Sequence, residues 1–147
     1  MKTVQQKWFV IVAMAIMLCL TGLVNSGTAF ADRCVDNGDG TVTDNGTGLM
    51  WQKATFGSTD WGYAKSYCSG LSLAGHSDWR LPNKDELVEL YISDCKNLMH
   101  VENSSYWSST TYTEDTTNAW FVYSYNGLAN TDHKKYSYYV RAVRDVQ

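Results

Sequence analysis

The first thirty-one residues resemble a segment that is removed from the working protein. This feature constrains the fold most, because only the residues that follow would form it. Lys2 and Lys7 precede an almost wholly apolar run, Trp8–Val24, and the small-x-small sequence Ala29-Phe30-Ala31 follows it. This layout is typical of a secretory signal peptide. Its removal leaves 116 of the 147 residues, which suits one domain over residues 32–147. The alternative is a membrane anchor, for which the apolar run is slightly short.

The predicted mature part is acidic and rich in Trp and Tyr. Removing residues 1–31 takes away two of the twelve Lys and Arg and none of the fifteen Asp and Glu, so the formal net charge moves from −3 to −5. Nucleic-acid binding needs a basic surface, so we expect no nucleic-acid partner. All ten Tyr remain, with five of the six Trp. Their amphipathic rings serve binding surfaces as well as cores.

The mature part keeps three cysteines, Cys34, Cys68 and Cys95. An exported chain meets an oxidising compartment, and three thiols allow at most one internal disulfide. All three pairings are possible. We favour Cys68 with Cys95, because each lies at or just beyond a helix that should pack on the same sheet. A zinc site from Cys68, His76, Cys95 and His100 fits no familiar ligand spacing, so we predict no metal site.

The first two thirds of this part predict a β-hairpin and two helices. Turn residues and β-branched residues alternate over residues 35–51, which favours the hairpin over a calcium loop, since no EF-hand spacing is present. Apolar residues at three- and four-residue steps predict a helix over residues 60–71. A second helix should run from Lys84 to about Ile92, with Asn83 as its N-cap and Glu86 completing a capping box.

The last third changes to strands. Aromatic and β-branched residues predict strands over residues 106–110, 119–125 and 136–143, with a hairpin loop over residues 126–134. A hairpin, two helices and a run of antiparallel strands define an α+β domain with its helices segregated from the sheet.

Several separated motifs resemble a known domain family. The resemblance begins at Asp36-Asn37-Gly38-Asp39-Gly40-Thr41-Val42-Thr43-Asp44 and Thr47-Gly48-Leu49-Met50-Trp51. It continues at Gly75-His76-Ser77-Asp78-Trp79-Arg80-Leu81-Pro82 and Glu86-Leu87, then at Tyr106-Trp107-Ser108-Ser109-Thr110, Ala119-Trp120 and Val140-Arg141-Ala142-Val143-Arg144. In this order, these motifs are similar to the family named for the C-terminal domain of the bacterial collagen-like adhesin Lcl.

The resemblance implies an exported bacterial protein with a C-type-lectin-like fold. The Arg80–Pro82 segment is also similar to the helix start of the sulfatase-modifying proteins, which are expected to share that fold. The name-giving member implies adhesion through sulfated glycans. This chain has no collagen-like stretch, and its acidity disfavours a polyanion ligand. The family often has Cys where Ala142 stands; if that cysteine pairs with position 68, Cys68 here lacks its partner.

The sequence predicts no enzyme and no cofactor. None of His76, His100 and His133 lies in a nucleophile elbow or in a metal-binding pair. The reactive cysteine pair of the sulfatase-modifying proteins has no counterpart after Cys95. Calcium-dependent lectins resemble one another in a Glu-Pro-Asn loop, and Glu102-Asn103 lacks the proline, so no motif supports calcium.

The residues inside the family motifs are assigned to structure. Asp78 and Arg80 should lie on the same side of their segment, where a buried ion pair is the expected role. The structural motif residues are Trp51, Asp78, Trp79, Arg80, Pro82 and Trp107.

Surface aromatics and a basic cluster near the C-terminus supply the ligand-binding candidates. Tyr and Trp stack on sugar rings or anchor protein interfaces. The candidates are Trp120, Tyr123, Lys134, Lys135, Arg141 and Arg144.

We therefore predict a secreted or periplasmic, non-enzymatic domain that binds a glycan or another surface polymer. The alternative is a protein-interaction or homo-oligomerisation module that uses the tyrosines Tyr136, Tyr138 and Tyr139. A hydrolytic enzyme, in which His76, Asp78 and Arg80 would converge in a pocket, is a third hypothesis.

Overall fold

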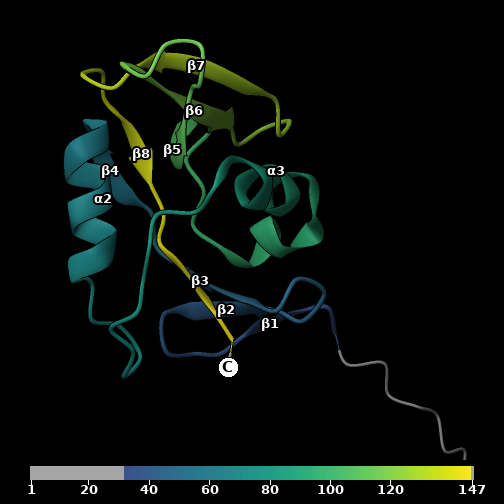
Figure 1. Cartoon of the computed structure of the whole chain (residues 1–147). Coiled ribbons are helices and arrows are strands. Elements are labelled where there is room, and N and C mark those ends of the chain that lie inside the picture. Colours follow the sequence, from purple (N-terminus) through teal and green to yellow (C-terminus); the bar gives the residue numbers. More distant parts are fainter. Residues whose placement is uncertain (1–31, 147) are drawn as a thin grey trace, which may run out of the picture. The chain divides into compact units, whose positions relative to one another are not determined.

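Two sheets and two α-helices build residues 32–146, the part of the chain that this computed structural model describes (Figure 1). The predicted signal peptide, residues 1–31, lies outside the described residues. No helix within residues 32–146 is long and apolar enough to cross a membrane.

The smaller sheet has the strand order β1-β2-β3-β9. Its strands are β1 (Cys34–Asp36), β2 (Thr41–Asp44), β3 (Leu49–Gln52) and β9 (Val143–Asp145), and all neighbours are antiparallel. The β1–β2 turn contains Gly38 and Gly40 at φ +75° and +90°, a conformation that other residues adopt at a cost. The predicted hairpin is therefore confirmed, and the last strand of the domain extends it.

The larger sheet has the order β4-β8-β5-β6-β7. Its strands are β4 (Phe56–Thr59), β5 (Ser105–Thr111), β6 (Asn118–Tyr123), β7 (Ala129–His133) and β8 (Tyr138–Val140). The β5–β8 pair is parallel, and the other pairs are antiparallel.

Two predictions for the last third were wrong. The predicted hairpin loop contains strand β7, and the predicted strand over residues 136–143 is divided between the two sheets. Arg141 and Ala142 connect β8 to β9, and the side chain of Arg141 turns inward at this point. The alternation of apolar residues continues through the break, which is why it suggests one strand.

Both helices begin at or within one residue of their predicted starts. Helix α2 (Trp61–Gly70) has Asp60 as its N-cap. Helix α3 (Lys84–Ile92) has the predicted bounds, and its capping box is formed by Asn83 and Glu86. A short 3₁₀ helix, η1 (Asp94–Leu98), follows α3. Helix α3 contacts β5 and β6, and η1 contacts β1 and β2, so this unit joins the two sheets.

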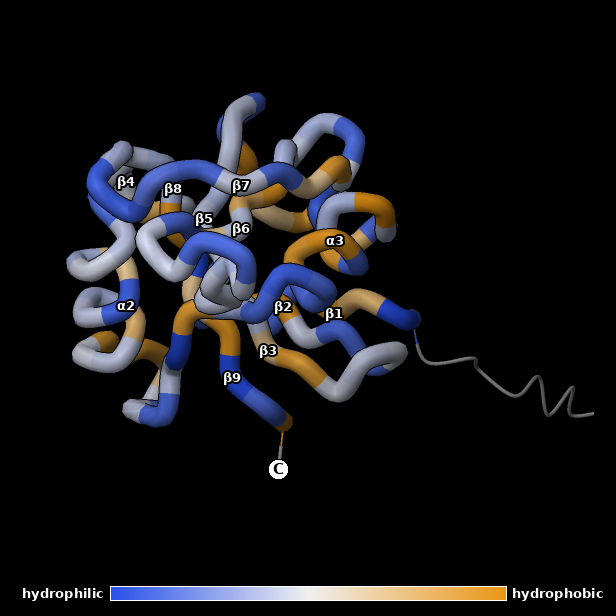
Figure 2. Tube along the Cα trace, turned by 45° about the horizontal axis from the view of Figure 1, so that its top comes forward, coloured by the Kyte–Doolittle hydropathy of each residue, from blue (hydrophilic) through white to orange (hydrophobic). Residues whose placement is uncertain are grey.

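The larger sheet separates two hydrophobic cores. One core lies between the smaller sheet, α3 and one face of the larger sheet, and contains Trp51, Leu87 and Tyr106. The other lies between α2 and the opposite face, and contains Cys68, Trp79 and Trp107. In Figure 2 the apolar segments lie in the strands and in α3, with polar connections between them. The α+β class is confirmed, and the C-type-lectin-like assignment stays a prediction.

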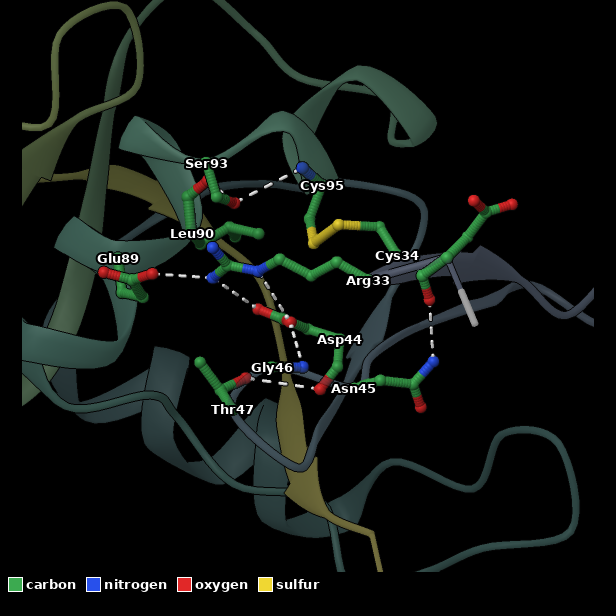
Figure 3. A network of polar contacts seen from close by, with 11 residues as sticks. Arg33, Cys34, Asp44, Asn45, Gly46, Thr47, Glu89, Leu90, Ser93 and Cys95 are labelled. Atoms are coloured by element: carbon green, nitrogen blue, oxygen red, sulfur yellow. Dashed lines mark hydrogen bonds and ion pairs between the residues drawn. A yellow bond between two sulfur atoms is a disulfide. The ribbon is translucent and has the colours of Figure 1, made fainter. Parts of the chain in front are cut away.

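The disulfide joins Cys34 to Cys95, so the favoured Cys68–Cys95 pairing was wrong. Cys34 lies on β1 and Cys95 on η1, which pack together (Figure 3). Cys68 points from α2 into the other core as a free, fully buried thiol. The two helices lie on opposite faces of the sheet, and this geometry prevents the predicted bridge.

An ionic cluster lies beside this disulfide. Arg33 donates to both oxygens of Asp44, at 3.0 and 3.1 Å, and to Glu89 at 2.6 Å (Figure 3). Burial alone would raise the pKa of Asp44, but hydrogen bonds from Arg33 and from the Gly46 N–H hold it below its ordinary value. The cluster connects β2 with α3 and supports the same junction as the disulfide.

Candidate functional site

The predicted basic cluster near the C-terminus does not form. Arg141 is fully buried, and it donates to the carbonyl oxygens of Gln52, Lys53 and His100 and to Oγ1 of Thr55. It therefore ties together the β3–β4 connection and the loop after η1, and its side chain is closed to ligands.

Arg144 is also buried and pairs with Asp78, with Nε 2.7 Å from Oδ1. Arg80 pairs instead with Glu86 at 2.8 Å and with Asp145 at 3.3 Å. The expected buried Asp78–Arg80 pair is therefore wrong, because each residue finds its partner on another element. The hydrogen bond from Arg144 lowers the pKa of Asp78.

The other motif residues lie inside the domain. Trp51, Trp79 and Trp107 are almost fully buried, and Pro82 is buried. The indole N–H of Trp107 donates to the Thr59 carbonyl oxygen at 2.9 Å.

Lys134 lies beside Trp61, at the end of β5. We define the lysine–tryptophan face as Trp61, Lys65 and Lys134, together with Ser109 and Thr111 near the end of β5. Tyr123 and Lys135 lie outside it: Tyr123 packs on Phe121 and Tyr125, and the ammonium of Lys135 lies over Tyr136.

Trp61 is the centre of this face. The Lys134 ammonium lies 4.1 Å from the centroid of its ring, and the Lys65 ammonium lies at 4.6 Å. The indole N–H donates to the Ser108 carbonyl oxygen at 2.8 Å, which fixes the half-buried ring against β5. The ring is therefore held in one orientation, with two cations close to it.

Trp120 lies outside this face. On β6 it alternates with Ala119 and Phe121, which belong to the core beneath α2, so its ring points to the opposite side of the larger sheet. There its ring meets Tyr112 edge-on at 5.7 Å, and the Lys84 ammonium lies 5.0 Å from its centroid.

The two ammonium groups of this face have no carboxylate partner among the described residues. Neither Lys65 nor Lys134 has a carboxylate oxygen within 4 Å in residues 32–146. A net-acidic domain thus carries a local cationic patch around Trp61.

A hollow of about 450 Å³ opens beside this patch, between α2 and the segment that leads into α3. It has the size of a small-molecule site. The residues that line it are Lys65, Ser66, Ser69, Arg80, Leu81 and Ser109.

Two of the three groups considered for catalysis, Asp78 and Arg80, are engaged in ion pairs with other residues. Arg80 lines the hollow, but its guanidinium is engaged by Glu86, and Asp78 pairs with Arg144. His133 accepts a hydrogen bond at Nδ1 from the Lys135 N–H, in the turn after β7. Burial raises the pKa of the Cys68 thiol to about 12, so it stays protonated at neutral pH.

One group of three possible metal ligands occurs within residues 32–146, namely Cys34, Asp44 and Cys95. The two sulfurs are bonded to each other, and the carboxylate is bonded to Arg33. In this state the group does not offer a metal site.

The final tyrosine-rich strand is internal. Strand β8 pairs with β4 on one side and with β5 on the other, so it has no free edge for another copy. Tyr138 instead donates to Asp132 at 2.7 Å, and Tyr136 is exposed beside it.

The residues of this face that the sequence did not predict as site residues are Trp61 and Lys65. Both lie in the segment whose apolar spacing predicts a helix, and both are far from Lys134 in the sequence. The clearest available signal was the Trp61–Lys65 spacing of four residues, which places both on one face of a helix.

The fold and the face together define an α+β domain with a cationic aromatic surface. The model of the Lcl C-terminal domain family matches residues 40–144, and the chain belongs to that family. No curated protein matches the chain closely enough to supply a relative.

Proposed function

We propose that this protein is a non-enzymatic recognition domain that binds a glycan or another surface polymer through the lysine–tryptophan face. The observation that carries the proposal is Trp61, a fixed aromatic ring close to two lysines that lack carboxylate partners among the described residues. Aromatic rings stack on sugar rings, and ammonium groups donate to hydroxyl or acidic groups.

The hollow beside Trp61 supports the same proposal. Hydroxyl groups from Ser66, Ser69 and Ser109 line it, and Lys65 is shared between the hollow and the aromatic ring. A chain of linked sugars would place one ring on Trp61 and its neighbour in the hollow.

We further propose that the protein acts outside the cytoplasm, as a secreted or periplasmic protein. The Cys34–Cys95 disulfide supports an oxidising compartment. Membership of a family named for an adhesin domain also supports recognition at a surface.

The test measures binding of a panel of neutral and acidic polysaccharides by calorimetry, with and without calcium. Lys65 is exposed, and alanine suits its helical position, so Lys65→Ala removes a charge without disturbing the fold. We expect affinity to fall about fivefold, the equivalent of roughly 1 kcal/mol for one cation at an aromatic ring.

Lys53→Ala is the matched control. It removes the same charge from a residue that pairs with Asp36, away from Trp61, and should leave affinity unchanged. Failure of every polysaccharide to bind, or an equal loss in both variants, would contradict the proposal.

A further inference from the structure

A second hollow, of about 310 Å³, lies at the opposite end of the β5–β6 pair. The first hollow includes Ser109 near the end of β5, whereas this one lies where Ser104 meets Ser124. A seven-residue strand separates the two, or about 20 Å. The residues that line the second hollow are Lys96, Asn97, Val101, Asn103, Ser124 and Tyr125.

Hydrogen bonds fix the base of this hollow. Ser124 donates from its N–H to the Ser104 carbonyl oxygen at 2.9 Å, and its Oγ accepts from the Ser104 N–H at 3.1 Å. The same Oγ donates to the Glu102 carbonyl oxygen at 2.7 Å. The loop that carries Asn103 is therefore clamped to the end of β6.

Tyr125 supplies an exposed aromatic wall. Its side chain is 61% exposed, and its ring packs on Tyr123 with centroids 5.6 Å apart. The contact with Tyr123 limits the orientations of the ring while leaving much of its surface to solvent.

Two amides lie beside this wall. Asn97 and Asn103 are exposed, and their side chains form no hydrogen bond with any residue in the range 32–146. Each amide offers two donors and one acceptor, which matches the hydroxyl groups of a sugar.

Fixed charge contributes little to this hollow. No Asp or Glu lines it, and its one cation, Lys96, donates to the Tyr91 carbonyl oxygen at 2.6 Å at the end of α3. The first hollow, by contrast, shares Lys65 with the cationic patch. The second hollow therefore favours an uncharged ligand.

We propose that this second hollow is a binding site for an uncharged pyranose residue, an inference that rests on the proposed function in glycan recognition. One face of the sugar ring stacks on Tyr125, and its hydroxyl groups bond to Asn97 and Asn103. The volume is close to the lower end of the range of about 300–1,000 Å³ for small-molecule sites, which suits one sugar ring. A polymer that carries both neutral and acidic residues would then engage both ends of β5.

The test is an NMR titration of ¹⁵N-labelled protein produced from the full chain. The probes are methyl α-glucopyranoside, methyl β-galactopyranoside and N-acetylglucosamine, followed by the polysaccharide that binds best. Side-chain amide signals of Asn97 and Asn103 report on the second hollow. The indole N–H signal of Trp61 reports on the lysine–tryptophan face, and that of Trp120 reports on the opposite side of the larger sheet.

We expect at least one sugar to shift the Asn97 and Asn103 signals with a dissociation constant of about 1 mM, as befits a ligand with few atoms. Tyr125→Ala should weaken this binding about fivefold, and Tyr125→Phe should retain it, because stacking needs only the ring. Tyr63→Ala, which removes another exposed tyrosine from helix α2, should have no effect.

The outcomes separate this inference from the proposed function. Shifts at the Trp61 indole alone would overturn the second site and leave the lysine–tryptophan face intact. Shifts at Asn97 and Asn103 that persist unchanged in Tyr125→Ala would overturn the stacking geometry. Absence of binding by every sugar and polysaccharide would overturn both proposals.

Discussion

At the residue scale, Arg141 carries a buried charge whose hydrogen-bond acceptors are all neutral. Three backbone carbonyl oxygens and one hydroxyl group accept from its guanidinium. A guanidinium satisfies this arrangement because its donors form a planar fork, which an ammonium cannot reproduce. Where the β3–β4 connection meets the loop after η1, this side chain thus supplies the hydrogen bonds that regular secondary structure would otherwise provide.

We predict that Arg141→Lys destabilises the domain strongly. Several buried carbonyl oxygens would lose their donors, and we expect a loss of about 3 kcal/mol in the free energy of unfolding. Urea denaturation measures this loss. The control is Lys53→Ala at a partly exposed ion pair, where we expect at most about 1 kcal/mol. Equal losses in the two variants would contradict the role assigned to Arg141.

Asp44 makes the stability of the domain dependent on acid. Its pKa is lower in the folded state than in the unfolded chain, so its contribution is fully present above the unfolded pKa of about 4. The contribution is lost as the pH falls through the folded pKa. We expect urea denaturation between about pH 5 and pH 2 to show a fall in stability that is smaller in Asp44→Asn. The same fall in that variant would show that other carboxylates are responsible.

At the scale of elements, the start of α3 is set by two reciprocal hydrogen bonds. The Asn83 side chain accepts from the Glu86 N–H, and the Glu86 side chain accepts from the Asn83 N–H, both at 2.8 Å. Glu86 also holds Arg80, so the cap fixes the segment that lines the first hollow. Local sequence chemistry therefore positions part of the candidate site.

We predict that Asn83→Ala lowers the free energy of unfolding by about 1 kcal/mol, the usual value of an N-cap. Asn83→Asp should retain most of the stability, because aspartate caps equally well. Thermal unfolding of the two variants checks this. A destabilisation of the same size in both would show that the amide acts in another way.

The outer edge of the larger sheet is protected by its own side chains. On β7 the Thr131 N–H donates to Oδ1 of Asn130, at 2.8 Å, and the His133 N–H donates to Oδ1 of Asp132, at 2.7 Å. These groups would otherwise be free to pair with a strand of another molecule. Polar residues that indicate a loop in the sequence thus belong to a strand whose edge they block.

Removing these caps should promote association. We predict that Asn130→Val combined with Asp132→Val gives a larger sedimenting mass as concentration rises, because two edge N–H groups and a flat β-branched surface become available. Sedimentation velocity of the variant and of the unmodified protein measures this. Identical concentration dependence in both would contradict the protective role of the caps.

At the scale of the whole molecule, one covalent bond joins the smaller sheet to the helical layer. Cys34 and Cys95 are 61 residues apart in the sequence. Closing a loop of this length is worth about 4 kcal/mol in the chain-entropy model.

Reduction should therefore lower the melting temperature markedly, by an amount that Cys34→Ser combined with Cys95→Ser reproduces. Calorimetry with and without dithiothreitol measures the change. Cys68→Ala provides the control, because it leaves the disulfide in place and should show the same response to the reductant as the unmodified protein. A melting temperature that does not respond to reduction would contradict the role of the bond.

The sequence was most informative where structure is decided locally. The cap of α3, the first hairpin and the α+β class follow from turn chemistry and periodicity over short segments. The disulfide partner, the inward turn of Arg141 and the partners of Asp78 and Arg80 depend on elements that are distant in the sequence. The lysine–tryptophan face combines Trp61, Lys65, Ser109, Thr111 and Lys134, and only the folded sheet brings them together.

The register of the smaller sheet brings the start of its first strand and the end of its last strand close together. Cys34 pairs with Asp44, Asp44 with Leu49, and Leu49 with Asp145, so the first residue of β1 and the last residue of β9 lie in one row. Three strand spacings separate them, or about 14 Å. A tether attached at either end, or at both, would leave from the same rim of the smaller sheet. Such a domain can be inserted into a longer chain at a single point of the smaller sheet. The larger sheet then lies at the end of the domain away from the attachment (Figure 1).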